Sequence, residues 1–186
     1  LNLLNQIPVY IFRNFKMINP IELKKKYLQS REKLFSSLLN SNDGVTFNKN
    51  HTMLVDSVVK DLVLGIQRQF PVSDFSLIAV GGYGRQDLSP KSDVDLLFLY
   101  KKSNKNIRGF ITALNNSLWD LGLEVGISFL TLKQAIIDSK KDIKTVTKFA
   151  ESRHLIGDED YYGEFVRSIK ILIGKLNSLK LSEKKL

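Results

Sequence analysis

The chain has 186 residues, enough for one domain with a sizeable hydrophobic core. Apolar residues make up 43% of it and charged residues 25%, which excludes an intrinsically disordered protein. The absence of cysteine excludes disulfides and thiolate metal sites and is typical of a reducing compartment, so a cytoplasmic protein is expected.

Hydropathy and charge limit the partners. No apolar run approaches the roughly 18 residues of a membrane span, so no membrane partner is expected. The apolar segment Ile7 to Phe15 contains Arg13 and lacks a small-residue cleavage site, which argues against a signal peptide. The formal net charge of +9 permits binding to polyanions. Because the lysine clusters have no interleaved aromatic residues, a solvated basic surface is favoured over a nucleic-acid interface.

Two helices are predicted after residues 1–20, an N-terminal extension with no identifiable chemistry. The first spans Ile21 to Leu39 and ends in a polar turn that contains glycine. In the second, apolar residues recur at four-residue steps, which is typical of a helix that packs on a core. These positions are Leu54, Val58, Leu62 and Ile66. His51 near its start has no second histidine or cysteine close by, so a surface residue is favoured over a metal ligand.

The most informative stretch of the chain follows these helices. An apolar run typical of a strand ends in Gly81 and Gly82, and ten residues later Asp93 and Asp95 open a second apolar run. Because side chains alternate along a strand, the two carboxylates point to one face with Cα atoms roughly 6.5 to 7 Å apart. Two such carboxylates suit a hard cation such as Mg²⁺. Glycines at a strand end let backbone N–H groups approach a phosphate, and a helix starting there adds its positive end.

The loop between the glycines and the aspartates contains two further candidates. Arg85 is predicted to bind phosphate, because a guanidinium offers paired donors to phosphate oxygens. The alternative is an ion pair with Asp87 or Asp74 that only orders the loop. Ser92 either bonds to phosphate or caps the turn before the strand.

The next predicted strand, Leu123 to Leu130, contains Glu124 between apolar neighbours and follows an amphipathic helix from Asn106 to Leu121. An ionised carboxylate in that setting needs a metal or a cationic partner. Glu124 is therefore either a third metal ligand or the partner of a lysine or arginine. Asp120, at the end of the preceding helix, is the less favoured candidate.

Helices are predicted over most of the remaining chain. They span Thr131 to Lys141, Asp142 to Ile156, and Tyr161 to Leu176. His154 is expected to pack or to lie on the surface rather than to act as a base. The expected division is an extension at 1–20, a helical segment at 21–70, a core at 71–141 and C-terminal helices at 142–186.

Three strings of the chain resemble a known family. GGYGRQDLSPKSDVDLL resembles the signature of the nucleotidyltransferase superfamily that includes DNA polymerase beta, a glycine pair followed by an Asp-hydrophobic-Asp strand. Its details are similar to the N-terminal domain of the bifunctional uridylyltransferase/uridylyl-removing enzymes, which modify the nitrogen-regulatory protein PII. LWDLGLEVG and TVTKFAESRHLIGD also resemble strings of that family, and the resemblance covers about residues 20–175.

The resemblance implies an α/β (α+β) fold with a small mixed sheet flanked by helices. It implies transfer of UMP from UTP to a tyrosine of PII, with release of pyrophosphate and with two Mg²⁺ ions. The implied catalytic residues and metal ligands are Asp93, Asp95 and Glu124. The implied nucleotide-binding residues are Gly81, Gly82, Arg85, Ser92 and Arg153, the last of which either reaches the triphosphate or pairs with Glu151 or Asp158.

Two departures from the family keep other functions open. Ile127 and Leu130 stand where the family has a histidine and an arginine. Neither histidine of the chain precedes an aspartate, so the uridylyl-removing half is expected to be absent and the chain to be a fragment or a stand-alone form of the first domain. The alternatives are transfer of another nucleotide, such as an adenylyl group, or to another acceptor, and a degenerate nucleotide-binding remnant without catalysis.

Overall fold

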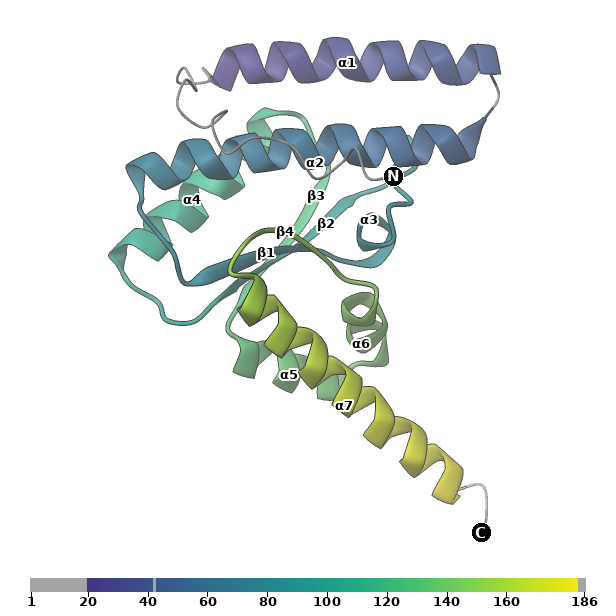
Figure 1. Ribbon diagram of the computed structural model, residues 1–186, viewed down its shortest axis with the longest axis vertical. Coiled ribbons are helices and arrows are strands. Elements are labelled where there is room, and N and C mark those ends of the chain that lie inside the picture. Colours follow the sequence, from purple (N-terminus) through teal and green to yellow (C-terminus); the bar gives the residue numbers. More distant parts are fainter. Residues whose placement is uncertain (1–19, 42, 184–186) are drawn as a thin grey trace, which may run out of the picture.

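A four-stranded mixed sheet forms the centre of the computed structural model, which describes residues 20–41 and 43–183 (Figure 1). The strands are β1 (Phe75–Ala79), β2 (Val94–Tyr100), β3 (Val125–Leu130) and β4 (Arg153–Gly157). Their order in the sheet is β3-β2-β1-β4. β2 runs parallel to β3 and antiparallel to β1, and β4 is antiparallel to β1. The α/β class with a small mixed sheet is therefore confirmed.

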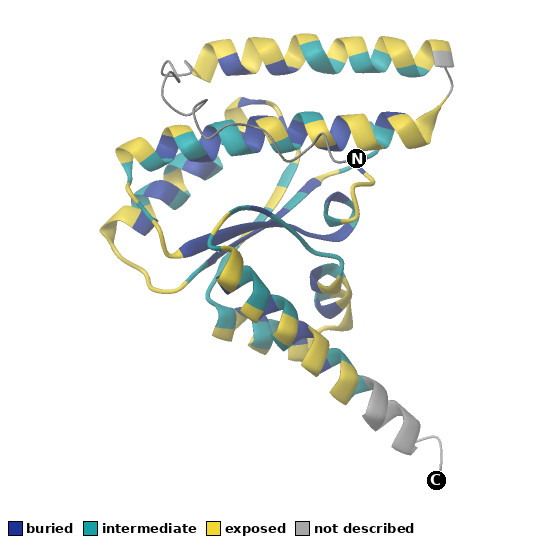
Figure 2. Cartoon of the chain, viewed as in Figure 1, coloured by how far each residue is buried: buried dark blue, intermediate teal, exposed yellow. Residues whose placement is uncertain are grey.

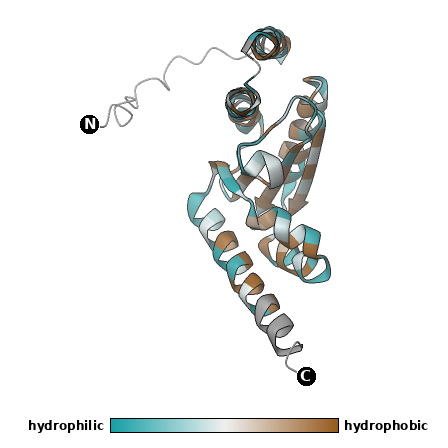
Figure 3. Cartoon of the chain, turned by 90° about the vertical axis from the view of Figure 1, so that its right-hand side faces the viewer, coloured by the Kyte–Doolittle hydropathy of each residue, from teal (hydrophilic) through white to brown (hydrophobic). Residues whose placement is uncertain are grey.

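Helices cover both faces of this sheet. They are α1 (Pro20–Ser41), α2 (Gly44–Gln69), α3 (Gly81–Gly84), α4 (Lys105–Asp120), α5 (Leu132–Lys141), α6 (Ile143–Ala150) and α7 (Glu159–Glu183). α2 and α4 lie on one face and α5, α6 and α7 on the other (Figure 1). Figure 3 shows α1 and α2 nearly end-on, with α2 between α1 and the sheet. None of the described helices combines the length and the apolar character that crossing a bilayer requires.

Two cores result from the alternation of side chains along the strands. On the α2 and α4 face, Phe75 stacks on Phe98 with ring centroids 4.9 Å apart, and Phe110 of α4 packs against both. On the other face, Leu97 and Leu99 of β2 join side chains of α5, α6 and α7. β1 and β2 are buried on both sides (Figure 2). This double burial explains the nearly continuous apolar run of β2.

The helix predicted from Asp142 to Ile156 is wrong in its second half. Helix α6 ends at Ala150, and Arg153–Gly157 pairs with β1 as strand β4. Gly157 has φ +107, and a Cβ there would stand 2.4 Å from the carbonyl oxygen of Phe75, so the close approach of β4 to β1 depends on a glycine. The open edge of β1 therefore overrides local helix propensity. The predicted domain division stays a prediction, with β4 lying after residue 141.

His51 is a second correction, because it is buried and not on the surface. Its ring lies 5.4 Å from that of Phe47 and 6.4 Å from that of Phe35, and its Nδ1 is 3.1 Å from the carbonyl oxygen of Leu88. Burial lowers the pKa of His51. The predictions for residues 1–19, including the segment Ile7 to Phe15, lie outside the described residues.

Candidate functional site

The two aspartates lie at the start of β2, on the sheet face that α5, α6 and α7 cover. Asp95 belongs to the strand and Asp93 stands two residues earlier, so both side chains share the face of Leu97. Asp93 is exposed, whereas the Asp95 side chain is 31% exposed. The strand thus presents one accessible and one partly enclosed carboxylate.

The diglycine turn lies against the Asp95 carboxylate. β1 leads directly into α3, and the N–H of Val80 donates to the carbonyl oxygen of Asp95 at 3.1 Å. Gly81 has φ +60, a conformation that glycine adopts without strain. A Cβ on Gly81 would stand 3.5 Å from Oδ2 of Asp95 and 3.7 Å from Cγ of Lys148. A bare backbone therefore faces this carboxylate.

Lys148 was missed by the sequence reasoning. Its Nζ donates to Oδ1 of Asp95 at 2.6 Å, and the lysine side chain is 38% exposed. α6 carries Lys148 to this position because Val146 and Phe149 of the same helix are buried against the core. A lone lysine on an amphipathic helix carries no local signal, so only the packing of α6 reveals the contact.

Glu124 lies beside the aspartates but at the edge of the sheet. The parallel pairing sets Val94 opposite Val125 and Asp95 opposite Gly126, and the N–H of Val94 donates to the carbonyl oxygen of Glu124 at 2.7 Å. Continued by one residue, this register brings Glu124 next to Asp93 on the same face. Glu124 is exposed and precedes β3, whereas the sequence placed it within that strand.

The absence of a side chain at Gly126 of β3 leaves space for the Asp95 carboxylate. A Cβ at Gly126 would stand only 2.7 Å from Oδ1 of Asp95. The carboxylate of Asp95 is thus held between two glycine backbones, those of Gly81 and Gly126, with the Lys148 ammonium on the same oxygen.

The possible ligands at this site are carboxylate oxygens, the type of donor that binds a hard cation. Asp93 and Asp95 share one face, and the register adds the Glu124 carboxylate; oxygen donors of this type are those that Mg²⁺ prefers. Within the described residues, however, no three acidic, histidine or cysteine side chains lie close enough together to hold a metal ion as they stand. Lys148 donates to Oδ1 of Asp95 in this arrangement.

Arg85 and Ser92 both have local partners. Arg85 pairs with Glu151, the residue that caps the end of α6, and not with Asp87 or Asp74. The two side chains are 49% and 34% exposed, so the pair contributes little to stability. The Oγ of Ser92 lies 2.5 Å from that of Ser89, within the turn before β2. The predicted phosphate contacts of both residues stay predictions.

Arg153 is not brought together with the aspartates. It lies opposite Ala79 on the sheet face toward α2, where its guanidinium donates to both carboxylate oxygens of Asp56 at 2.7 and 3.0 Å. Its Nη2 also lies 3.3 Å from the carbonyl oxygen of Tyr83 in α3. Arg153 pairs with neither of its two expected partners, because Glu151 pairs with Arg85 and Asp158 with Lys101.

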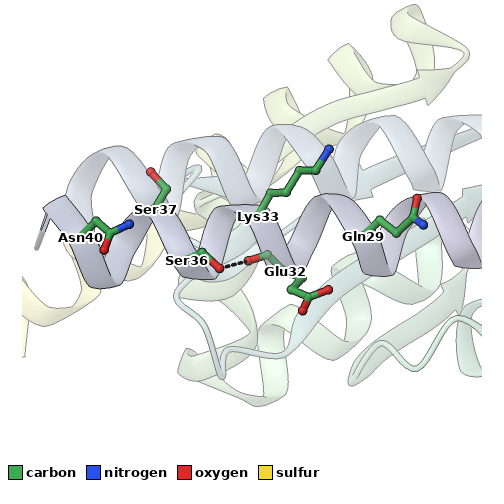
Figure 4. A pocket seen from close by; sticks show the side chains of 6 residues that line it. All are labelled: Gln29, Glu32, Lys33, Ser36, Ser37 and Asn40. Carbon is green, nitrogen blue, oxygen red and sulfur yellow. Dashed lines mark hydrogen bonds between the residues drawn. The ribbon is translucent and has the colours of Figure 1, made fainter.

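A surface hollow lies elsewhere, along α1 (Figure 4). It is lined by Gln29, Glu32, Lys33, Ser36, Ser37 and Asn40. All six are polar residues of one helix, and none was predicted to bind a ligand. This hollow is therefore separate from the carboxylate site.

The family model described as "Nucleotidyltransferase domain" matches residues 44–156. The bifunctional uridylyltransferase/uridylyl-removing enzyme of Nitrosospira multiformis is 29% identical over 167 residues, which cover 86% of this chain and 18% of that protein. The enzyme of the same name from Idiomarina loihiensis is 34% identical over 155 residues, which cover 74% of this chain and 17% of that protein. The chain thus spans less than a fifth of the length of these relatives.

One solved structure, a toxin-antitoxin complex with AMP-PNP, aligns with a TM-score of 0.43 and 16% identity over 68% of this chain and 95% of that chain. The likeness is too loose to inform the site.

Proposed function

Because the chain belongs to the nucleotidyltransferase domain family, we propose that it is a metal-dependent enzyme that transfers UMP from UTP to a tyrosine of the protein PII. The reaction joins the tyrosine oxygen to the α-phosphorus and releases pyrophosphate. The observation that carries the proposal is the placement of Asp93 and Asp95 on one sheet face, beside the bare backbone at Gly81. The uridylyltransferase name of the relatives supports UTP, and the motif resemblance supports PII as the acceptor.

In the proposed reaction the carboxylates bind the metal and the glycine backbone binds the triphosphate. Asp93, Asp95 and Glu124 would hold Mg²⁺, with two ions implied by the family resemblance. When bound, the metal stabilises charge on the transferred phosphoryl group and lowers the pKa of the attacking hydroxyl. Gly81 and Gly82 offer backbone N–H groups to the triphosphate without a Cβ in the way.

Arg85 adds positive charge on the open side of the same turn. To reach a phosphate it gives up its ion pair with Glu151, which costs little because both side chains are partly exposed. Arg153 acts through the turn, since its guanidinium holds the carbonyl oxygen of Tyr83. Ser92 orders the turn that leads into the aspartates.

The test is UMP transfer from labelled UTP to purified PII by Asp93→Asn and Asp95→Asn variants. Each is expected to lose activity by about a hundredfold or more, because each removes a charge on which the phosphoryl transfer depends. Asp120→Asn is the matched control, since Asp120 is an exposed carboxylate at the end of α4. Full activity in both aspartate variants would refute the assignment of the site.

Transfer of another nucleotide or to another acceptor is the second candidate, and the replaced family residues favour it. Ile127 packs with the core on the α2 and α4 face, and Leu130 lies opposite Leu99, four residues along the strands from Asp95. Ile127 and Leu130 therefore leave the carboxylates in place but change the side chains of β3 near them. Competition between UTP and ATP in the presence of Mg²⁺ separates the two candidates, and preference for ATP would exclude uridylyl transfer. Absence of turnover with any nucleotide would indicate a remnant that only binds.

A further inference from the structure

The ion pair between Lys148 and Asp95 joins α6 to the carboxylate site at the start of β2. The Lys148 Nζ lies 2.6 Å from Oδ1 of Asp95, and the two side chains are 38% and 31% exposed. The oxygen that it bonds is also the one that leans over Gly126 toward β3. The Lys148 ammonium thus bonds the carboxylate oxygen that lies nearest to Gly126.

An ammonium and a divalent cation on the same oxygen exclude each other. Both need the negative charge of Asp95, and two positive charges on one carboxylate oxygen repel each other, with solvent screening part of the repulsion. Among residues 20–41 and 43–183, no group of three acidic, histidine or cysteine side chains lies close enough together to hold a metal as the side chains stand. Lys148 therefore neutralises the charge of the Asp95 carboxylate in this arrangement.

Lys148 also has a route away from Asp95. Its Cγ would lie 3.7 Å from a Cβ on Gly81, so its stem runs along the diglycine turn where the proposed function positions the triphosphate. A lysine ammonium on a flexible four-carbon stem can turn from one anion to another nearby without moving the backbone.

We propose that Lys148 is an exchangeable counter-ion: it holds Asp95 until a divalent cation arrives and then transfers its charge to the phosphates of the nucleotide at Gly81. The inference rests on the proposed function, since it needs Asp95 to be a metal ligand. This exchange makes cation and nucleotide binding cooperative. The nucleotide draws Lys148 away from Asp95 and so frees the carboxylate for the cation, and the cation frees Lys148 for the phosphates. By linkage, the nucleotide must then strengthen cation binding by the same factor as the cation strengthens nucleotide binding.

The test measures Mn²⁺ binding without nucleotide, from the electron paramagnetic resonance signal of free Mn²⁺. Lys148→Met keeps the apolar stem over Gly81 and removes the charge, so Mn²⁺ is expected to bind about tenfold more tightly than to the wild type. Lys144→Met is the matched control, because Lys144 is an exposed lysine one turn earlier on α6. It is expected to leave Mn²⁺ affinity unchanged.

A second measurement uses a non-hydrolysable UTP analogue. In the wild type the analogue is expected to strengthen Mn²⁺ binding, and in Lys148→Met this strengthening is expected to shrink by about tenfold, because the exchange is lost. Lys148→Gln repeats both measurements with a polar side chain, and thermal unfolding of each variant shows that it is folded.

The outcomes separate this inference from the proposed function. If Asp95→Asn weakens Mn²⁺ binding while Lys148→Met leaves it unchanged or weaker, Lys148 is not a competing counter-ion and only the inference fails. If Mn²⁺ affinity is the same in the wild type and in Asp95→Asn, the aspartate is not a ligand. The proposed function and the inference then fail together.

Discussion

Replacement of Arg153 by methionine is expected to destabilise the fold rather than to disrupt nucleotide binding directly. The guanidinium is tied to both oxygens of Asp56 and to the carbonyl oxygen of Tyr83, and the Arg153 and Asp56 side chains are only 22% and 14% exposed. The pair joins α2, β4 and α3 across the sheet face opposite the aspartates of the site. Arg153→Met would leave the Asp56 carboxylate enclosed without its partner.

The size of the effect follows from that burial. Removing one partner of a buried ion pair costs about 3 kcal/mol, because the remaining charge keeps its desolvation penalty without compensation. For a chain of this length, each kcal/mol lowers the melting temperature by roughly 2 to 4 °C, so a decrease of roughly 6 to 12 °C is expected. Thermal unfolding and urea titration measure it.

Arg85→Met is the matched control, since it makes the same substitution in a half-exposed ion pair. The Arg85→Met substitution is expected to lower the free energy of unfolding by less than about 1 kcal/mol. The variant is expected to bind UTP more weakly, because Arg85 faces the proposed triphosphate site. The double variant Asp56→Leu with Arg153→Met is expected to recover most of the stability, because no buried charge is left unpaired. A melting temperature of Arg153→Met within about 2 °C of the wild type, together with lost UTP binding, would refute this reasoning and favour a direct nucleotide contact.

Three further variants test close contacts and a buried histidine. Gly126→Ala would place a Cβ 2.7 Å from Oδ1 of Asp95; the carboxylate must shift, so transfer activity is expected to fall at least tenfold with a nearly unchanged melting temperature. Gly84→Ala would place a Cβ 1.9 Å from the carbonyl oxygen of Glu151, which is backbone, so a loss of about 3 kcal/mol or more in urea unfolding is expected. Because burial lowers the pKa of His51, the unfolded state binds more protons, and stability is expected to fall as the pH drops below the ordinary value of about 6.5. In the His51→Gln variant, the urea midpoint is expected to depend less on pH below about 6.5 than in the wild type. The same pH dependence in both proteins would show that His51 is not the group responsible.

The elements nearest the site could be predicted because their signals are local. The apolar run of β2 with acids at its start predicts a buried strand whose carboxylates share a face, since side chains alternate with a period of two residues. The glycine pair at the end of β1 predicts a turn that approaches a ligand, because only glycine combines positive φ with an absent Cβ. The strand and the turn are both found in the structure, and the turn lies against the Asp95 carboxylate. Its approach to a ligand stays a prediction.

The contacts of the arginines were beyond sequence reasoning. Arg85 had nearby aspartates in the sequence, yet its partner is Glu151, 66 residues away. Arg153 had Glu151 and Asp158 nearby and pairs instead with Asp56, 97 residues away. Sequence distance says little about such pairs, since the packing of helices on the sheet decides which charges meet.

By itself, the sequence determined the diglycine turn and the aspartate pair, because strand alternation and glycine backbone freedom act within a few residues. Its fold class followed from the resemblance of its motifs to a known family. Only the tertiary structure decided that Arg153–Gly157 completes the sheet as β4, because that depends on the free edge of β1. It also decided that Lys148 reaches Asp95, since the position of α6 is set by the burial of Val146 and Phe149. Long-range packing, which no local pattern encodes, thus supplies the positive charge at a site whose negative charges the sequence already shows.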